Sequence, residues 1–262
     1  MKNFSTMKKT TKISSTIEKT RNTSSQLDFY NDFSKFIESS EGSFFDKMRA
    51  FPVYTTRQVI TRFLERYEVF KMIANNTGDI FECGVGGGLG LMAFSHFCSI
   101  FEPNHYTRNI VGFDTFEGFT GISDKDHTSS AEHLKEGGLN FGSYEQILES
   151  IRLYDRNRPI GNIEKTRVIK GDISITLPKY INEHPETIIS LLYLDLDLYL
   201  PTKRTIECVW QKIPKGGIIC FDELNHKDYP GETLALCETI GLENFELKRL
   251  SFSPMLTYIT KE

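Results

Sequence analysis

Short apolar runs alternate with helical stretches along most of this 262-residue chain. Five runs have the length and composition of buried strands: residues 79–85, 109–116, 166–172, 188–197 and 217–223. Helical patterns fill the intervals between and after them: residues 88–101, 143–157, 176–183, 201–212 and 231–241. Buried strands that alternate with helices predict an α/β fold with a doubly wound, mostly parallel sheet.

Both ends of the chain depart from this alternation. Residues 1–26 are rich in Ser, Thr and Lys without periodicity, and we expect a disordered tail there, with a basic targeting segment as the alternative. Residues 27–76 form a predicted N-terminal helical segment or lid, and residues 77–262 the main domain. Residues 245–252 and 255–260 are joined by Ser253-Pro254 without room for a helix, which predicts an antiparallel hairpin at one sheet edge.

Composition excludes several function classes. The net charge of −4 disfavours a nucleic-acid partner, and no apolar stretch is long enough to cross a membrane. The five cysteines are odd in number and none has C-x-x-C spacing, which argues against a disulfide framework or a zinc site. We therefore expect reduced thiols in a cytoplasmic protein.

A glycine-rich loop follows the first predicted strand, in the sequence FECGVGGGLG at residues 81–90. Ligands of doubly wound sheets bind beyond the carboxyl ends of the strands, where glycines let the backbone approach a ligand closely. The dinucleotide fingerprint G-x-G-x-x-G is not met, because Leu89 or Leu91 stands at its third glycine. Glu82 directly before Gly84 and Gly86 would repel a pyrophosphate and attract an ammonium group, which favours S-adenosylmethionine (SAM) over a dinucleotide.

Single carboxylates end the next two strands. Asp114 is placed to accept hydrogen bonds from ribose hydroxyls, a feature that NAD-binding and SAM-binding folds share. Asp172 is placed either to bind an adenine amino group or to cap the segment that follows, and the sequence leaves both open.

Acidic pairs follow the fourth and fifth strands. Asp195 and Asp197 belong to the first pair, and Asp222 and Glu223 to the second. Unpaired carboxylates gathered at one sheet edge are unfavourable, and a hard divalent cation such as Mg²⁺ would stabilise them. The alternative is that they cap helices or pair with Lys203 and Arg204.

These segments together resemble the macrocin O-methyltransferase family, from about Phe51 to the C-terminus. The resemblance rests on the order and spacing of seven stretches: FPVYTTRQVITRFLERYEVFK, GDIFECGVGGG, VGFDTFEGF, GSYEQILESIRLYD, VIKGDISITLP, YLDLDLYLPTKRTIE and IPKGGIICFDEL. It implies a seven-stranded Rossmann-like methyltransferase sheet and SAM- and Mg²⁺-dependent methylation of sugar hydroxyls.

The resemblance also implies site residues. Those for the cofactor are Tyr54, Thr55, Glu82, Gly84, Gly86, Asp114, Thr115, Phe116, Ser143, Asp172 and Ile173. Those for the metal are Asp195, Asp222 and Glu223, although the family commonly reads Asp-Asp-Tyr where this chain has Asp222-Glu223-Leu224.

The expected reaction is in-line methyl transfer to a sugar oxygen, with Asp195, Asp197 or His226 as the proton acceptor. A solvated loop histidine is an equal interpretation of His226. Other functions stay open: a catechol O-methyltransferase, a nucleotide-dependent oxidoreductase, and a SAM-binding protein without catalysis. The expected partner is a small-molecule sugar, and a homo-oligomer stays open.

Overall fold

The chain is described here by a computed structural model, which covers residues 22–127 and 131–262. It divides into two compact units, Met1–Thr56 and Arg57–Glu262. Most of the predicted tail, residues 1–21, lies outside the described residues. Helix α1 begins at Ser24, however, so the helical part of the chain starts earlier than predicted.

The described part of the smaller unit contains α1 (Ser24–Ser39), α2 (Phe44–Arg49) and a 3₁₀ turn, η2 (Phe51–Val53). Both α-helices begin with a capping box, in which a hydroxyl and an acid or amide three residues later satisfy free backbone amides. Within this unit the ring of Tyr54 stacks on Phe36. Tyr54 and Thr55 therefore belong to the smaller unit, and their cofactor role stays a prediction.

The larger unit is built on a seven-stranded sheet with the order β3-β2-β1-β4-β5-β7-β6. Its strands are β1 (Asp79–Cys83), β2 (Ile110–Asp114), β3 (Thr166–Lys170), β4 (Ile189–Leu194), β5 (Ile218–Phe221), β6 (Lys248–Arg249) and β7 (Thr257–Thr260). The first five strands pair in parallel, and β7 pairs antiparallel with both β5 and β6. The predicted doubly wound sheet and its C-terminal hairpin are confirmed.

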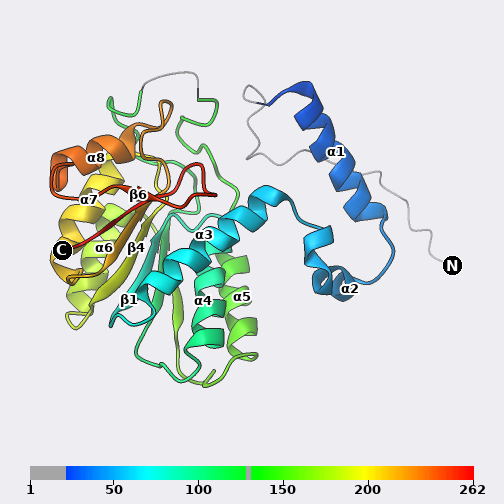
Figure 1. Cartoon of the computed structure of the whole chain (residues 1–262), viewed down its shortest axis with the longest axis horizontal. Coiled ribbons are helices and arrows are strands. Elements are labelled where there is room, and N and C mark those ends of the chain that lie inside the picture. Colours follow the sequence, from blue (N-terminus) through cyan, green and yellow to red (C-terminus); the bar gives the residue numbers. More distant parts are fainter. Residues whose placement is uncertain (1–21, 128–130) are drawn as a thin grey trace. The chain divides into compact units, whose positions relative to one another are not determined.

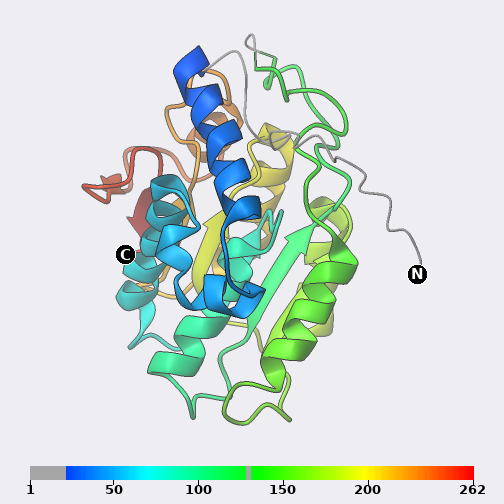
Figure 2. The same cartoon turned by 90° about the vertical axis from the view of Figure 1, so that its right-hand side faces the viewer.

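Helices cover both faces of this sheet (Figures 1 and 2). They are α3 (Arg57–Ile73), α4 (Leu89–Phe101) and α5 (Tyr144–Asp155) on one face, and α6 (Ile173–Glu183), α7 (Tyr199–Val209) and α8 (Gly231–Thr239) on the other, with a 3₁₀ turn, η3 (Trp210–Lys212), after α7. Each face has its own apolar core, because successive strand residues point to opposite sides. Among the described residues, no helix has the length and apolar character needed to span a bilayer.

Helix α3 belongs to the larger unit, which corrects the predicted boundary after residue 76. Its residues Val69, Phe70 and Ile73 are fully buried and contribute to the core on the α4 side of the sheet. The lid role expected for residues 27–76 stays a prediction.

Arg108, just before β2, stabilises the amino-terminal ends of the strands, at the opposite end of the sheet from the glycine loop. Its side chain is fully buried, and its Nε donates to Glu102 at 2.9 Å. The remaining donors reach Ser190 Oγ and the carbonyls of Gly78, Ile73 and Asn76. One guanidinium therefore ties together the end of α3, the starts of β1 and β4, and the end of α4.

We predict that Arg108→Met lowers the free energy of unfolding by about 3–5 kcal/mol, because it removes the buried guanidinium that pairs with the Glu102 carboxylate and donates to the carbonyl of Asn76. Urea unfolding followed by circular dichroism measures this. Arg152→Met, which removes an exposed pair with Glu149, should leave the unfolding midpoint essentially unchanged. Equal midpoints for the two variants would contradict the assignment.

Candidate active site

A cavity of about 470 Å³ opens at the carboxyl ends of the parallel strands. This volume is within the roughly 300–1,000 Å³ typical of small-molecule sites. Eleven of the sequence-predicted site residues line it: Gly84, Gly86, Asp114, Thr115, Phe116, Asp172, Ile173, Asp195, Asp197, Asp222 and Glu223. Two others in the same unit, Glu82 and Ser143, are not among the lining residues, and neither is His226.

The glycine loop forms one wall because its conformation excludes side chains. Gly84 has φ +94°, and a Cβ there would lie 1.9 Å from the carbonyl oxygen of Asp195. Gly86 has φ +50°, and its Cβ would lie 2.6 Å from the ring of Phe141. The loop can therefore pass close to the end of β4 only with glycine at position 84, whereas a side chain at position 86 would displace the ring of Phe141.

Asp114 fixes the shape of this loop from the end of β2. One of its carboxylate oxygens accepts hydrogen bonds from the amides of Val85 and Gly86, each at 2.8 Å, and the other accepts from the amide of Phe116 at 2.6 Å. A carboxylate has about four acceptor sites, so capacity remains for a hydroxyl of a ligand. Asp114 thus connects the two strand ends that were expected to hold the cofactor.

Two other predicted cofactor residues are helix caps. Asp172 accepts from the amide of Ser174 at 2.8 Å at the start of α6, and Ser143 accepts from Gln146 at the start of α5. Asp172 lines the cavity in addition to capping, so the two interpretations of this residue are compatible. Its contact with adenine, and any cofactor contact of Ser143, stay predictions.

Glu82 occupies a different position from the expected one. Its side chain is buried under α4, and a Cβ on Gly90 would lie 1.6 Å from its Oε1. Burial raises the pKa of Glu82 to about 8, against the opposing effect of Arg66, whose guanidinium lies 3.6 Å away. Since Arg66 itself lines the cavity, Glu82 supports the wall through this arginine, and direct contact with an ammonium group stays a prediction.

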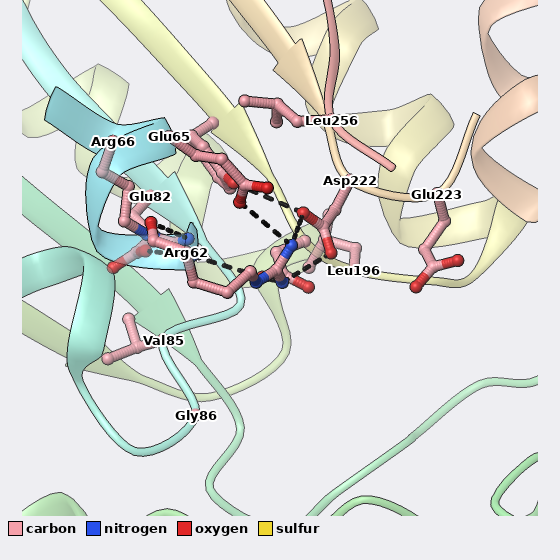
Figure 3. Close-up of polar contacts among 12 residues, drawn as sticks. Arg62, Glu65, Arg66, Glu82, Val85, Gly86, Leu196, Asp222, Glu223 and Leu256 are labelled. Atoms are coloured by element: carbon pink, nitrogen blue, oxygen red, sulfur yellow. Dashed lines mark hydrogen bonds and ion pairs between the residues drawn. The ribbon is translucent and has the colours of Figure 1, made fainter. Parts of the chain in front are cut away.

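The acidic edge of the cavity is held by Arg62 of α3 (Figure 3). Its guanidinium forms a two-pronged pair with Asp222, in which Nη1 bonds Oδ1 and Nη2 lies 2.6 Å from Oδ2. The same Nη2 lies 3.3 Å from Oδ2 of Asp195. Arg66, one turn along the helix, lies 3.6 Å from this Asp195 oxygen.

Glu223, the third predicted metal ligand, extends away from this cluster (Figure 3). Its carboxylate lies 3.7 Å from Nδ1 of His226, and the surrounding burial and neighbouring acids raise its pKa to about 10. Within the described parts of the chain, no three acidic, His or Cys side chains gather as a metal-binding group. The arrangement does not fit a divalent cation, because Arg62 already occupies the carboxylates of Asp195 and Asp222.

The backbones of the two acidic strand ends are joined by Glu232 of α8. This fully buried side chain accepts from the amide of Leu196 at 3.2 Å and from the amide of Glu223 at 3.0 Å. Burial raises its pKa well above the usual range. Glu232 thereby fixes the loop after β4 against the loop after β5.

Backbone strain concentrates around the cavity. Among the described residues, positive φ occurs at five that are not glycine, and three of them, Phe116, Leu139 and Asp197, line the cavity. Such conformations are costly for residues with a Cβ and persist where surrounding contacts impose them, often at functional sites. The strained residues lie on the loops after β2 and β4, which supports this cavity as the functional site.

The cofactor end fits SAM. It offers the glycine loop, the Asp114 carboxylate and the apolar side chains of Phe116 and Ile173. It has no phosphate-binding glycine fingerprint. These features match a ligand with an amino-acid end, a ribose and a base.

Comparison with known proteins decides the family. The sequence profile of the macrocin O-methyltransferase (TylF) family matches residues 61–231. The chain belongs to this family. It is therefore a SAM-dependent O-methyltransferase, as the resemblance implied.

Solved structures agree with this family. The structure of CalS11, a calicheamicin methyltransferase, has 29% sequence identity and a TM-score of 0.86 over 91% of this chain and 93% of that chain. The apo structure of CalS11, described as a TDP-rhamnose 3′-O-methyltransferase, gives 28% identity and a TM-score of 0.78 over 91% and 95%. The O-methyltransferase NovP, at 20% identity and a TM-score of 0.57 over 77% and 80%, shares the fold. No curated protein sequence matches the chain.

Three residues that hold the acidic side of the cavity together are not singled out by the sequence: Arg62, Arg66 and Glu232. The two arginines stand four residues apart, which places them on one helix face, but this spacing is also typical of a solvated face. Glu232 lies in the first turn of α8, where an acid ordinarily complements the helix dipole.

We predict that Asp114→Ala weakens SAM binding by about 1–3 kcal/mol, the scale of a lost charged hydrogen-bond acceptor, and loosens the Val85–Gly86 turn. Titration calorimetry with SAM measures the loss, and Asp124→Ala, at an exposed acid of the loop after β2, serves as the matched control. Unchanged SAM affinity in Asp114→Ala would remove this residue from the cofactor site.

Proposed function

We propose that this enzyme methylates a hydroxyl of a sugar, either a nucleotide-linked deoxysugar or a sugar carried by a glycosylated metabolite or polysaccharide precursor. The observation that carries the proposal is a single cavity that joins the SAM-type glycine loop to the acidic strand ends. Similarity to CalS11 over more than nine-tenths of both chains supports a sugar as the acceptor class.

The two ends of the cavity have different tasks. The glycine loop and Asp114 would hold the amino-acid and ribose parts of SAM, and Asp172 and Ile173 would flank its base. SAM, when bound, supplies a methyl group on a positively charged sulfur. The protein contributes the alignment of the acceptor oxygen with that methyl group, by holding the acceptor near the ends of β4 and β5.

Asp195 is the best-supported proton acceptor. It lines the cavity, and burial together with the neighbouring Asp222 raises its pKa to about 6 against the effect of Arg62. The side chain is therefore ionised at neutral pH and more basic than an ordinary aspartate. Asp197 lines the same wall, whereas His226 is not among the lining residues and pairs with Glu223.

The predicted Mg²⁺ is not part of this mechanism, because the described carboxylates do not form its ligand set. The metal requirement was implied by the acidic pairs and the resemblance alone. The homo-oligomer and the cytoplasmic location stay predictions. Residues 225–231 follow β5, and the rings of His226 and Tyr229 have centroids 5.5 Å apart. Neither side chain lines the cavity, so no contact with a sugar ring is assigned to them.

We predict that the purified enzyme transfers labelled methyl groups from SAM to a nucleotide-linked deoxyhexose with adjacent hydroxyls. A panel of TDP-deoxysugars, free sugars and catechols, analysed by mass spectrometry, identifies the acceptor class. Methylation of catechols with no turnover of any sugar would replace the proposal with the phenolic alternative.

We further predict that Asp195→Asn lowers kcat about 10²-fold or more, the usual scale for loss of a general base. Asp197→Asn provides the matched control and should reduce kcat far less. Calorimetry should give both variants wild-type SAM affinity. A larger loss in Asp197→Asn would transfer the proton-accepting role to that residue.

A further inference from the structure

We propose that the guanidinium of Arg62 takes the place of a divalent metal at the acceptor end of the site, so that methyl transfer by this chain is metal-independent. The reaction rests on the proposed function, whereas the pairing of Arg62 with Asp195 and Asp222 is present in the protein without substrate or cofactor. It assigns to Arg62 the role of a positioning residue for Asp195 and Asp222.

The position of Arg62 is the first argument. Its donors engage both oxygens of Asp222 and one oxygen of Asp195, which are two of the three carboxylates expected to bind the metal. A two-pronged arginine–carboxylate pair is geometrically specific, and a single metal ion would need the same oxygen lone pairs. Asp222 is also buried, so its charge needs a partner in every state of the enzyme.

The charge of the cluster is the second argument. Arg66 adds a second positive group, 3.6 Å from Oδ2 of Asp195, and is held over the ring of Tyr193 at 4.6 Å. The hydroxyl of Tyr193 donates to Asp222 at 3.3 Å, which directs one more donor at the same carboxylate. Arg66 is shared with Glu82, and Arg62 with Glu65. Two guanidinium groups therefore already stand beside Asp195 and Asp222, and a divalent cation added here would meet their like charge.

The direction of Glu223 is the third argument. Its backbone amide donates to Glu232, and its carboxylate lies 3.7 Å from Nδ1 of His226. The Glu223 carboxylate is set apart from the Arg62–Asp222 pair (Figure 3). Bringing it to a metal shared with Asp195 would require a new side-chain conformation as well as the departure of Arg62. The ligand set is thus divided between two separate interactions.

The partial exposure of Arg62 gives it a function beyond neutralisation. About a third of its side chain is accessible, and it lines the cavity next to Asp195. Arginine has five donors in a rigid plane, so a guanidinium that fixes two carboxylates can still donate toward an acceptor oxygen. Arg62 would then hold the acceptor hydroxyl and Asp195 in a fixed relation.

The test compares the full-length wild type with Arg62→Met, Arg62→Lys and the double variant Arg62→Met/Asp222→Asn. Mn²⁺ alone is the probe, and electron paramagnetic resonance measures its binding without SAM or acceptor. Wild type should show no saturable Mn²⁺ binding. Arg62→Met should gain a saturable site, which the double variant loses again, because the ion occupies the vacated carboxylates. Arg57→Met, at an exposed arginine of the same helix, should behave as wild type.

Turnover gives a second measurement. Wild-type activity should survive exhaustive chelation, whereas Arg62→Met should lower kcat about 10²-fold, the scale of one lost preorganised donor, with partial recovery in Arg62→Lys. Saturable Mn²⁺ binding by wild type with an affinity unchanged in Arg62→Met would overturn the proposal. So would turnover that chelation abolishes and Mg²⁺ restores.

The two measurements separate this proposal from the proposed function. If no sugar is methylated, the acceptor assignment fails while Mn²⁺ binding still tests Arg62. If Arg62→Met does not fold, as circular dichroism would show, wild type and Arg62→Lys carry the binding measurement.

Discussion

Charge balance at the carboxyl edge of the sheet is the constraint on which the rest of the site depends. Strands β1, β4 and β5 end in or beside the carboxylates of Glu82, Asp195 and Asp222, and so many acids in one buried place would repel each other. Helix α3 supplies the compensation through Arg62 and Arg66. Its apolar face and its arginines thus act together, because packing against the core delivers the two guanidinium groups to the acids.

The fold was predictable from the sequence because its signals are local. Each signal is contained in about ten residues: the apolar runs, the helical periods and the lack of room for a helix before the last strand. The structure has the elements that these signals predict. The acids at the strand ends were found in the same way. The sequence does not predict the partner of each acid, because the partners are distant in the chain: Arg62 and Asp222 are 160 residues apart.

Residues that can serve two roles mark a second limit on what the sequence can predict. A carboxylate at the start of a helix has the same sequence context whether it caps, binds a ligand or does both, and Asp172 both caps α6 and lines the cavity. Glu82 was expected to contact the cofactor, which stays a prediction; alternation along β1 places it under α4, where Arg66 approaches it. Only packing of α3 and α4 on that face decides its surroundings.

The two ends of the cavity differ in how strongly the fold constrains them. The cofactor end is made mainly of backbone: Gly84 and Gly86 have conformations that a side chain would disturb, and Asp114 is held by three amides. The acceptor end is made of side chains that meet across α3, β4 and β5, and one arginine decides which oxygens are accessible. A substitution of Arg62 on α3 would therefore change the charge of this end while leaving the contacts of the cofactor loop in place. Family membership consequently informs the SAM end more strongly than the chemistry at Asp195 and Asp222.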